Sequence, residues 1–223
     1  MTIASKEKNV LNIPKNKQET KLFYLFIKRV FDLFFSLIGL LFLFPFLFAI
    51  YFLIKITSKG PGIFKQERVG LNEKLFNIYK FRTMRQLKLK SDTLITQGEK
   101  DPRITKMGFF LRKYKIDELP QLVNVLNGSM SFVGPRPEVE KFVKLYTTEQ
   151  KKVLQVKPGI TDLASLEFKD ESKILSGVKN IEEFYMKKIV PQKIKLNLEY
   201  IKKQSFLYDI KIILMTLKKI LKN

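Results

Sequence analysis

The chain has 223 residues and a formal net charge of +21, and it contains no histidine, cysteine or tryptophan. These absences exclude imidazole acid–base catalysis, thiolate nucleophiles, disulfides and the usual zinc ligand sets. Any bound metal should be a hard cation such as Mg²⁺, and any covalent catalysis must use a hydroxyl, a lysine or a carboxylate. The positive charge is typical of proteins that bind polyanions, which leaves nucleic acid, anionic membrane lipid and phosphorylated substrates open.

The N-terminal part of the chain predicts a tail followed by a membrane helix. Residues 1–20 are polar and rich in Lys, Asn and Gln, which is typical of a flexible tail. Residues 21–57 contain a run without charge, from Leu33 to Ile54, that would extend roughly 33 Å as a straight helix and could cross a bilayer core. We therefore predict a membrane helix over residues 21–57.

The course of this helix through the membrane has two interpretations. Pro45 lies near the middle of the uncharged run and should kink the helix. Lysine or arginine flanks the run at both ends, so the flanking charge favours neither orientation. A re-entrant helix that bends at Pro45 and returns to the same face fits both features. A single span that tolerates the proline is the alternative.

A β-hairpin and short helical segments are predicted in residues 58–192. Ile63–Val69 and Leu75–Phe81 are two short stretches with the character of strands on either side of a Gly-Leu-Asn-Glu-Lys turn, and they predict the hairpin. Residues 88–100 are polar and predict a loop, and Thr105–Lys113 predicts a short helix. The fold class that results is α+β, mainly helical with one hairpin.

The stretch Arg112–Gly128 places two adjacent carboxylates, Asp117 and Glu118, after a basic run. Apolar residues then recur at helical spacing up to Gly128, so a helix should start near Asp117 and stop at the glycine. One interpretation is that Asp117 is only the N-cap and Glu118 only favours the helix N-terminus. The other is a reactive carboxylate pair in a site that also binds phosphate.

The segment after this helix holds a single arginine between two prolines. Pro135 and Pro137 stiffen the backbone and would reduce the entropy that Arg136 loses on binding an anion, although a plain surface loop explains the same residues. Further on, Glu138–Gln155 and residues 180–188 have helical patterning, and residues 157–161 form a Pro-Gly turn.

The C-terminal segment, residues 193–223, predicts a basic amphipathic helix that begins after Ser205 as N-cap. Such a helix can lie on anionic lipid or pack on the protein's own core, and both can hold. Its apolar stripe consists of Phe206, Ile210, Ile213, Leu217 and Ile220.

These features together favour chemistry at lipid headgroup depth between a soluble phosphorylated compound and a phosphorylated lipid. Without histidine or cysteine, a carboxylate nucleophile is one of the few routes for stepwise transfer of a phosphoryl-type group. We expect nearby cations to keep Asp117 ionised and Mg²⁺, held partly by Glu118, to neutralise the phosphates.

The chain resembles the bacterial sugar transferase family, the small monotopic phosphoglycosyl transferases, from about Lys28 to the C-terminus. The motifs that carry the resemblance are KRVFDLFFSLIGLLFLFP at 28–45, YKFRTM at 79–84, DPRIT at 101–105, LRKYKIDELPQLVNVLNGSMSFVGPRPE at 111–138 and KPGIT at 157–161.

The resemblance implies a catalytic domain at residues 58–192 on the cytoplasmic face of the bacterial inner membrane. It implies transfer of a sugar-1-phosphate from a UDP-sugar to polyprenyl phosphate with release of UMP. Asp117 would be the nucleophile that forms a covalent phospho-sugar intermediate, and Glu118 would help to bind Mg²⁺. The remaining matched positions are Lys80, Arg112 and Arg136 near the phosphates, and Lys28, Arg29, Asp32 and Pro45 in the membrane helix.

The chain departs from the family pattern at a few positions. Phe44 stands where some members have serine, and Asp162-Leu163-Ala164-Ser165 replaces a run with glycine, an aromatic residue or leucine, alanine and glutamine. Lys169 replaces an arginine, and Asn197 an acidic residue. The identity of the sugar is therefore open, as is the oligomeric state. A membrane-tethered nucleic-acid-binding or scaffold protein is the alternative from another class, but the sequence contains no recognition module for nucleic acid.

Overall fold

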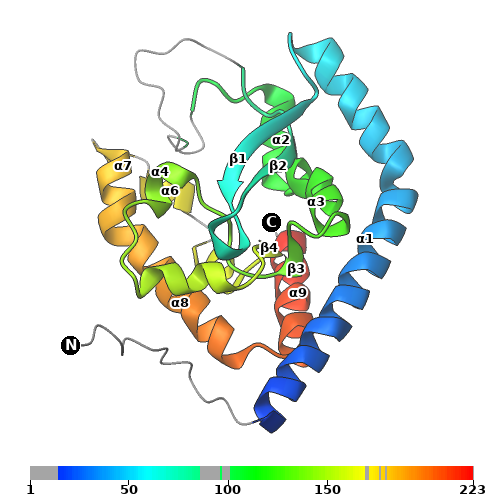
Figure 1. Ribbon diagram of the computed structural model, residues 1–223. Helices are drawn as coiled ribbons and strands as arrows, with labels where there is room; N and C mark the ends of the chain where they lie inside the picture. The colour runs from blue at the N-terminus through cyan, green and yellow to red at the C-terminus, as the bar shows by residue number, and fades with distance from the viewer. Residues whose placement is uncertain are drawn as a thin grey trace, which may run out of the picture.

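The computed structural model describes residues 15–85, 96, 101–168, 171–175, 177–178 and 180–222. Most of the predicted tail lies outside these residues, as does the predicted loop at 88–100 apart from residue 96. The described part is mainly helical with a small antiparallel hairpin, as predicted (Figure 1). Its helices are α1 (Lys15–Thr57), α2 (Lys106–Lys113), α3 (Leu122–Leu126), α4 (Glu140–Val143), α5 (Leu163–Glu167), α6 (Glu171–Leu175), α7 (Ile181–Phe184), α8 (Val190–Lys203) and α9 (Phe206–Leu221).

The strands form two small sheets. β1 (Ile63–Val69) and β2 (Leu75–Phe81) pair antiparallel with the predicted bounds, from Ile63 opposite Phe81 to Val69 opposite Leu75. β3 (Ser131–Val133) and β4 (Gly159–Thr161) pair in parallel. The short helical turns that complete the fold are η1 (Leu71–Glu73), η2 (Ile116–Gln121), η3 (Gln150–Gln155) and η4 (Tyr185–Ile189).

Helix α1 is one continuous helix of 43 residues with Pro45 inside it. It extends along one side of the molecule and bends partway along its length (Figure 1). Among the described residues, its segment Glu19–Thr57 is the one helix that is long and apolar enough to cross a membrane, and only 11% of its most apolar window is buried. The long apolar helix that the sequence predicts is therefore present. Its re-entrant course stays a prediction.

Polar side chains fix the N-terminal half of α1 to the body. The two terminal nitrogens of Arg29 donate to the carbonyl oxygens of Val125 and Leu126, at 2.7 and 3.0 Å. These carbonyls belong to the last turn of α3 and have no partner within the helix, so Arg29 caps it. Asp32 is 2% exposed and accepts from the backbone N–H of Phe132 in β3, at 3.1 Å.

Apolar side chains fix the C-terminal half of α1 to the same body. Ile50 and Ile54 are buried and pack with Phe81 of β2 and Leu111 of α2. The outer side of α1 is exposed before and between these attachment points. The exposed apolar residues include Phe23, Phe26, Phe34, Leu41, Phe42, Phe44, Phe48 and Phe52.

Two close backbone contacts hold the β3–β4 sheet together. Gly134, directly after β3, donates its N–H to the carbonyl oxygen of Thr161, and Gly159 donates to that of Pro135. A Cβ on Gly134 would lie 2.3 Å from the carbonyl oxygen of Lys157, and one on Gly159 would lie 2.1 Å from the nitrogen of Gly134. Only glycine fits at either position, and the contact fixes the start of the Pro135–Pro137 segment.

The prediction of one long helix over Glu138–Gln155 is wrong for the middle of this segment. The structure has helix only in α4 and η3. Thr147 and Gln150 explain the break, because each side chain accepts from the other residue's backbone N–H, at 3.3 and 2.9 Å. This reciprocal pair is a capping box, which starts a new helix rather than continuing one.

The C-terminal helices follow the sequence prediction with one addition. The helical patterning at 180–188 corresponds to α7 and η4, a π-helical turn that leads into α8 just before Pro191. A wider turn accommodates a proline that has no N–H to donate. The predicted division at residue 193 falls inside α8, and the domain division stays a prediction.

Helix α9 begins after Ser205, whose hydroxyl accepts from the N–H of Tyr208 as predicted. Its inner face is buried at Asp209 and Ile212, and Asp209 accepts from Tyr24 and Tyr200 and pairs with Lys28. Its outer face leaves leucines exposed. Helix α9 therefore packs on the core with one face and presents an apolar surface with the other. The exposed leucines are Leu207, Leu214, Leu217 and Leu221.

The Arg29 cap should contribute to stability. We expect Arg29→Met to lower the free energy of unfolding by about 1–3 kcal/mol, because two hydrogen bonds from a charged donor are lost next to partly buried carbonyls. Chemical unfolding in detergent measures the change. Lys21→Met, which removes an exposed cation from the same helix, is the matched control and should lie within about 0.5 kcal/mol of the wild type. An equal effect of the two variants would contradict the capping role.

Candidate functional site

The two predicted carboxylates lie together on η2, next to the hairpin. Lys115, which precedes η2, has a φ of 57°, in the left-handed region. Asp117 and Glu118 are 6% and 8% exposed. Asp117 lies near the N-cap but does not occupy it, because Lys115 takes that position and Asp117 lies inside the 3-10 turn, so the interpretation of Asp117 as a cap does not hold. The predicted helix end is confirmed, since Gly128 has a φ of 84° after α3.

Glu118 binds two cations that come from different elements. Its Oε1 accepts from Nζ of Lys80 in β2 at 2.9 Å. Its carboxylate also binds the guanidinium of Arg136, through Oε1 and, at 3.3 Å, through Oε2. Burial alone would raise the pKa of Glu118, but Arg136, Lys80 and Lys115 hold this pKa well below its usual range. Glu118 is therefore a fixed anion.

Asp117, one residue earlier, has a different environment. Its Oδ1 is fully buried and has no hydrogen-bond partner among the described residues. Burial, together with the negative charge of Glu118, raises the pKa of Asp117, although Lys80, Arg112 and Lys115 oppose the shift. Burial thus outweighs the nearby cations in the direction of the shift, and the expectation that these cations keep Asp117 ionised at neutral pH stays a prediction.

The other predicted cations lie around this pair in different roles. Arg112 does not bind either carboxylate among the hydrogen bonds of the described residues. Its Nε donates to the hydroxyl of Thr83 at 2.9 Å, and burial lowers its pKa although Asp117 opposes the shift. Burial also lowers the pKa of Lys80, against the attraction of Glu118. Glu118 in turn raises the pKa of Arg136.

Arg68 was not identified from the sequence, and it holds the segment that carries Arg136. From β1, it donates to the carbonyl oxygen of Pro137 at 3.0 Å and lies 3.6 Å from Glu138. Nothing in the sequence marks Arg68, because its role depends on the pairing of β1 with a segment about seventy residues later.

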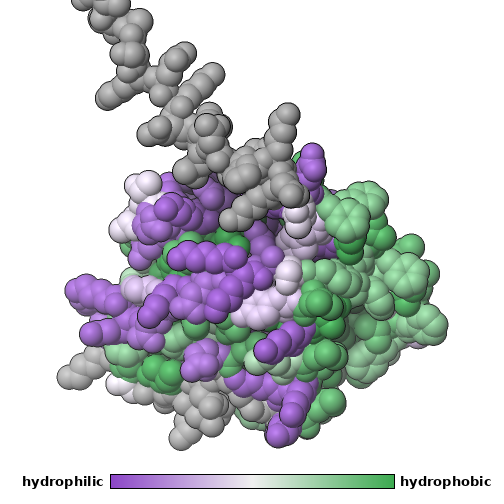
Figure 2. All heavy atoms as spheres, turned by 90° about the horizontal axis from the view of Figure 1, so that it is seen from below, coloured by the Kyte–Doolittle hydropathy of each residue, from purple (hydrophilic) through white to green (hydrophobic). Residues whose placement is uncertain are grey.

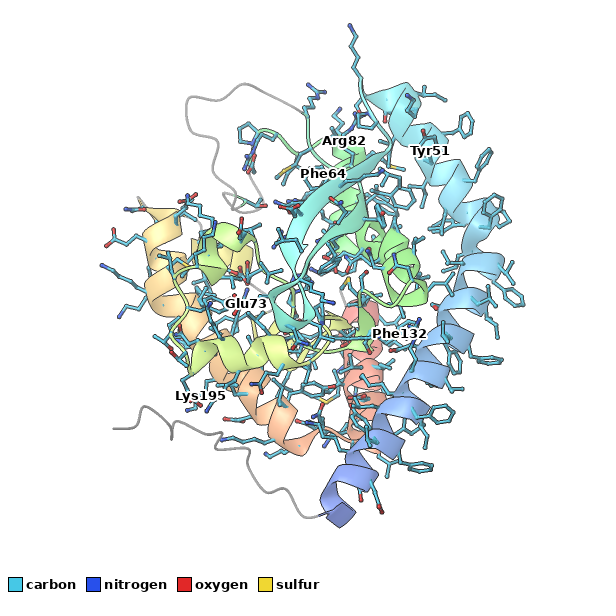
Figure 3. The ribbon with its side chains drawn as sticks, in the orientation of Figure 1. Tyr51, Phe64, Glu73, Arg82, Phe132 and Lys195 are labelled. Atoms are coloured by element: carbon cyan, nitrogen blue, oxygen red, sulfur yellow. The ribbon has the colours of Figure 1, made fainter. Side chains whose placement is uncertain are left out.

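The predicted residues of the membrane helix lie apart from the carboxylate pair. Lys28, Arg29 and Asp32 bind α9, α3 and β3, and none is bonded to Asp117 or Glu118 in the described part of the chain. They join α1 to the elements that carry the site. In Figure 3, Phe132 of β3 lies on the side of the body that faces α1, and Lys195 of α8 points away on the far side.

The residues present fit Mg²⁺ only with help from a substrate. No cluster of three or more acidic residues that could hold a metal occurs among the described residues. Asp117 offers a free Oδ1, and Glu118 adjoins it with both oxygens already bound by cations. Mg²⁺ commonly takes one or two carboxylates and completes its shell with substrate phosphates and water, so this pair fits that arrangement.

The surface of the molecule divides into an apolar and a polar side. Figure 2 shows apolar residues gathered on one side and hydrophilic residues on the other. The exposed phenylalanines and leucines of α1 contribute to this apolar surface, and on α2, Phe109 and Phe110 are each 50% exposed. So extended an apolar surface is typical of contact with a membrane.

Comparison with known proteins shows that this chain belongs to a class of transferases. Residues 23–223 match the family model described as bacterial sugar transferase, so the chain belongs to the bacterial sugar transferase family. It is 42% identical over 209 residues to galactosyl transferase CpsE of Streptococcus agalactiae serotype III (strain NEM316), which covers 89% of this chain and 43% of that protein.

Two further relatives carry more specific names. UDP-glucose:undecaprenyl-phosphate glucose-1-phosphate transferase of Escherichia coli (strain K12) is 37% identical over 202 residues, 86% of this chain and 40% of that protein. A putative undecaprenyl-phosphate N-acetylgalactosaminyl 1-phosphate transferase of Bacillus subtilis (strain 168) is 47% identical over 126 residues, 56% of this chain and 70% of that protein. The chain thus spans less than half the length of the first two relatives.

The opposite pKa shifts of the two carboxyls should appear as opposite effects on stability. A carboxyl with a raised pKa destabilises the folded state above that pKa and has no effect below its unfolded pKa. We therefore expect the neutral Asp117→Asn to raise the melting temperature at pH 7.5 by about 2–4 °C, the shift for about 1 kcal/mol in a chain of this size. The difference in melting temperature between Asp117→Asn and the wild type should disappear as the pH falls toward 4.

Glu118→Gln is the matched comparison. A carboxyl with a lowered pKa adds stability above its unfolded pKa, and that stability is lost as the pH falls through the folded pKa. Glu118→Gln should therefore lower the melting temperature at pH 7.5 and approach the wild type only in stronger acid. Thermal unfolding in detergent across this pH range measures both, and shifts of the same sign would contradict the assignment.

Proposed function

We propose that the protein transfers a sugar-1-phosphate from a UDP-sugar to polyprenyl (undecaprenyl) phosphate and releases UMP. Such a reaction is the first membrane step of glycoconjugate assembly, as in capsule, O-antigen, exopolysaccharide or glycoprotein synthesis. Family membership and the names of the relatives support this reaction class. The observation that carries the proposal is the unpaired, buried Oδ1 of Asp117 beside a Glu118 that two cations hold as an anion.

Asp117 is the nucleophile in this proposal. Its carboxylate oxygen attacks the phosphorus that carries the sugar, and the bond from that phosphorus to the bridging oxygen breaks. The bridging oxygen and its electron pair leave with UMP, so that a phospho-sugar remains bonded to Asp117. An oxygen of the polyprenyl phosphate then attacks the same phosphorus, the bond to Asp117 breaks, and the free carboxylate returns.

The environment of Asp117 suits a nucleophile. An oxygen without a hydrogen-bond donor is less stabilised than one that accepts several bonds, so less stabilisation is lost when it attacks. Glu118 holds Lys80 and Arg136 beside it, and these cations can move their bonds toward the transferred phosphate as charge develops there. Arg112, bonded to Thr83 rather than to a carboxylate, adds a further fixed cation.

Magnesium is part of the proposal. The residue that would hold it is Glu118, together with the phosphates of the donor, and Glu118 would release at least one of its present cation contacts. When bound, Mg²⁺ supplies charge neutralisation of the diphosphate.

We also propose that α1 is re-entrant and that the protein is monotopic on the cytoplasmic face of the bacterial inner membrane. Arg29 and Asp32 in its N-terminal half and Ile54 in its C-terminal half attach to the same body. A straight span would carry one of these attachment points, and the body bonded to it, into or across the bilayer. A helix that dips into the membrane with its exposed side keeps the whole body on one face.

The alternative of a nucleic-acid-binding protein has less support. Binding of single-stranded nucleic acid uses exposed aromatic side chains within a basic groove. In the described part of the chain, the exposed phenylalanines lie mainly on α1 and α2, the two helices with the largest exposed aromatic side chains, rather than in a basic groove.

Trapping of the covalent intermediate tests the nucleophile. With UDP-sugar and Mg²⁺ but no lipid acceptor, the rapidly quenched wild type should gain the mass of a sugar phosphate on the peptide with Asp117. Asp117→Asn should gain none, and Glu118→Gln should gain it about 10²–10³-fold more slowly, because a charged group that organises the site is lost. Glu73→Gln, an exposed acid-to-amide change, is the control and should react like the wild type. Adduct formation in Asp117→Asn would reject the assignment.

The absence of cysteine makes the topology directly testable. Single cysteines in place of Lys21 and Lys59, on either side of the apolar run, should both react with a membrane-impermeant maleimide added to the same face of sealed vesicles. A cysteine in place of Leu41, which is exposed within the run, should be protected by lipid. Labelling of the two flanking cysteines from opposite faces would establish a single span.

A further inference from the structure

Glu138 is a second carboxylate close to Arg136, and it has no role in the chemistry described above. It follows Arg136 by two residues, and both residues line the same two small cavities beside the Pro135–Pro137 segment. Arg136 nevertheless binds Glu118 of η2, and no hydrogen bond joins it to Glu138 among the described residues. Because a guanidinium and a nearby carboxylate attract each other strongly, something must hold Glu138 in another direction.

Tyr185, the first residue of η4, is what binds Glu138. Its hydroxyl donates to Oε1 of Glu138, and this is the one hydrogen bond to that carboxylate in the described part of the chain. Arg68 also lies near Glu138, but the 3.6 Å between them is too long for a hydrogen bond. The guanidinium of Arg68 donates instead to the carbonyl oxygen of Pro137 at 3.0 Å and to Gln66 at 2.6 Å. The direction of the Glu138 side chain therefore depends mainly on Tyr185.

The hydroxyl of Tyr185 is itself fixed in place. The residue is 5% exposed, and its ring packs against Phe142 with 5.6 Å between the ring centroids. Nζ of Lys193 donates to the hydroxyl oxygen at 3.4 Å. Since an ammonium group can only donate, the hydrogen of the hydroxyl remains for Glu138. Burial, together with the charge of Glu138, raises the pKa of Tyr185, so this hydrogen is retained at neutral pH.

We propose that Tyr185 is a positioning residue, which binds Glu138 and thereby leaves Arg136 to bind Glu118 and the phosphate that Asp117 attacks. The part of this inference that concerns the phosphate rests on the proposed function. Without the hydroxyl of Tyr185, the charged Glu138 would turn to Arg136 and form an ion pair with it. The site would then lose one of its two cations to a carboxylate that takes no part in the reaction.

Removal of the hydroxyl, followed by removal of the competing charge, tests the inference. Tyr185→Phe should lower kcat for UMP release about tenfold, which corresponds to about 1.4 kcal/mol. Addition of Glu138→Gln to this variant should bring kcat back to within about threefold of the wild type, because a neutral amide competes far less for a guanidinium. Glu138→Gln alone should also stay within about threefold, since its amide oxygen can still accept from Tyr185.

The recovery distinguishes positioning from support of the fold. If Tyr185 only stabilised the structure, the double variant would be no more active than Tyr185→Phe, and that result would overturn the inference. An unchanged kcat in Tyr185→Phe would overturn it as well. If Tyr185→Phe does not fold, Tyr185→Met takes its place, because the flexible methionine fills the space without a hydroxyl, and the same recovery is expected.

Tyr146→Phe is the matched control. Tyr146 lines the same two cavities, and burial, together with the charge of Glu138, raises its pKa. Among the described residues, however, no hydrogen bond joins its hydroxyl to Glu138. Tyr146→Phe therefore removes the same chemical group near the same carboxylate and should leave kcat within about twofold of the wild type.

Thermal unfolding tests the position of Arg136 without any activity. Glu118→Gln should lower the melting temperature at pH 7.5 about half as far in the Tyr185→Phe background as in the wild type, because Arg136 no longer binds Glu118 there. Equal lowering in the two backgrounds would overturn the inference even in an active enzyme. If the wild type releases UMP from no donor, the proposed function fails, and this comparison still decides whether Tyr185 positions Arg136.

Discussion

The arrangement of the site depends on one difference between two adjacent buried carboxylates. One of them binds the nearby cations, and the other does not. Glu118 binds both Lys80 and Arg136, and Asp117 has an oxygen without a partner. Neighbouring carboxylates in a shared environment normally acquire different pKa values, and here the division is set by which elements supply the cations. Lys80 comes from β2, Arg136 from the segment after β3, and both point at the same side chain. The pair therefore contains one carboxylate that two cations bind and one with an unpaired oxygen.

Helix α1 contributes to this arrangement as well as to membrane attachment. Arg29 caps α3, which follows directly on η2 with its two carboxylates. Asp32 accepts from Phe132 in β3, shortly before the segment with Arg136. The same helix thus holds both sides of the Glu118–Arg136 pair, although it touches neither residue in the described part of the chain. Membrane attachment and the geometry of the site are coupled through one helix.

Local features of the fold could be predicted from the sequence. The hairpin bounds, the helix over Lys106–Lys113, the Ser205 cap and the helix end at Gly128 depend on alternation, capping and glycine, which act over a few residues. Thr147 and Gln150 also carry a readable signal, since a threonine followed three residues later by a glutamine is a capping box.

Features that depend on long-range pairing could not be predicted. Which carboxylate receives Lys80 and Arg136, why Arg112 turns to Thr83, and how far burial raises the pKa of Asp117 follow only from contacts between distant segments. The composition correctly indicated that cations surround the site, but it could not show that Glu118 would bind two of them.

Three buried side-chain atoms have no hydrogen-bond partner among the described residues. They are Oδ1 of Asp117, Nε2 of Gln121 and Oδ1 of Asn197. Gln121 lies on η2 with Asp117, and Asn197 lies on α8. Each such atom opposes folding until a ligand or a water bonds to it. A ligand that bonds to Oδ1 of Asp117 would recover part of this free energy. The free energy withheld from folding at that oxygen is then available for binding, at the place where a phosphorylated substrate would react.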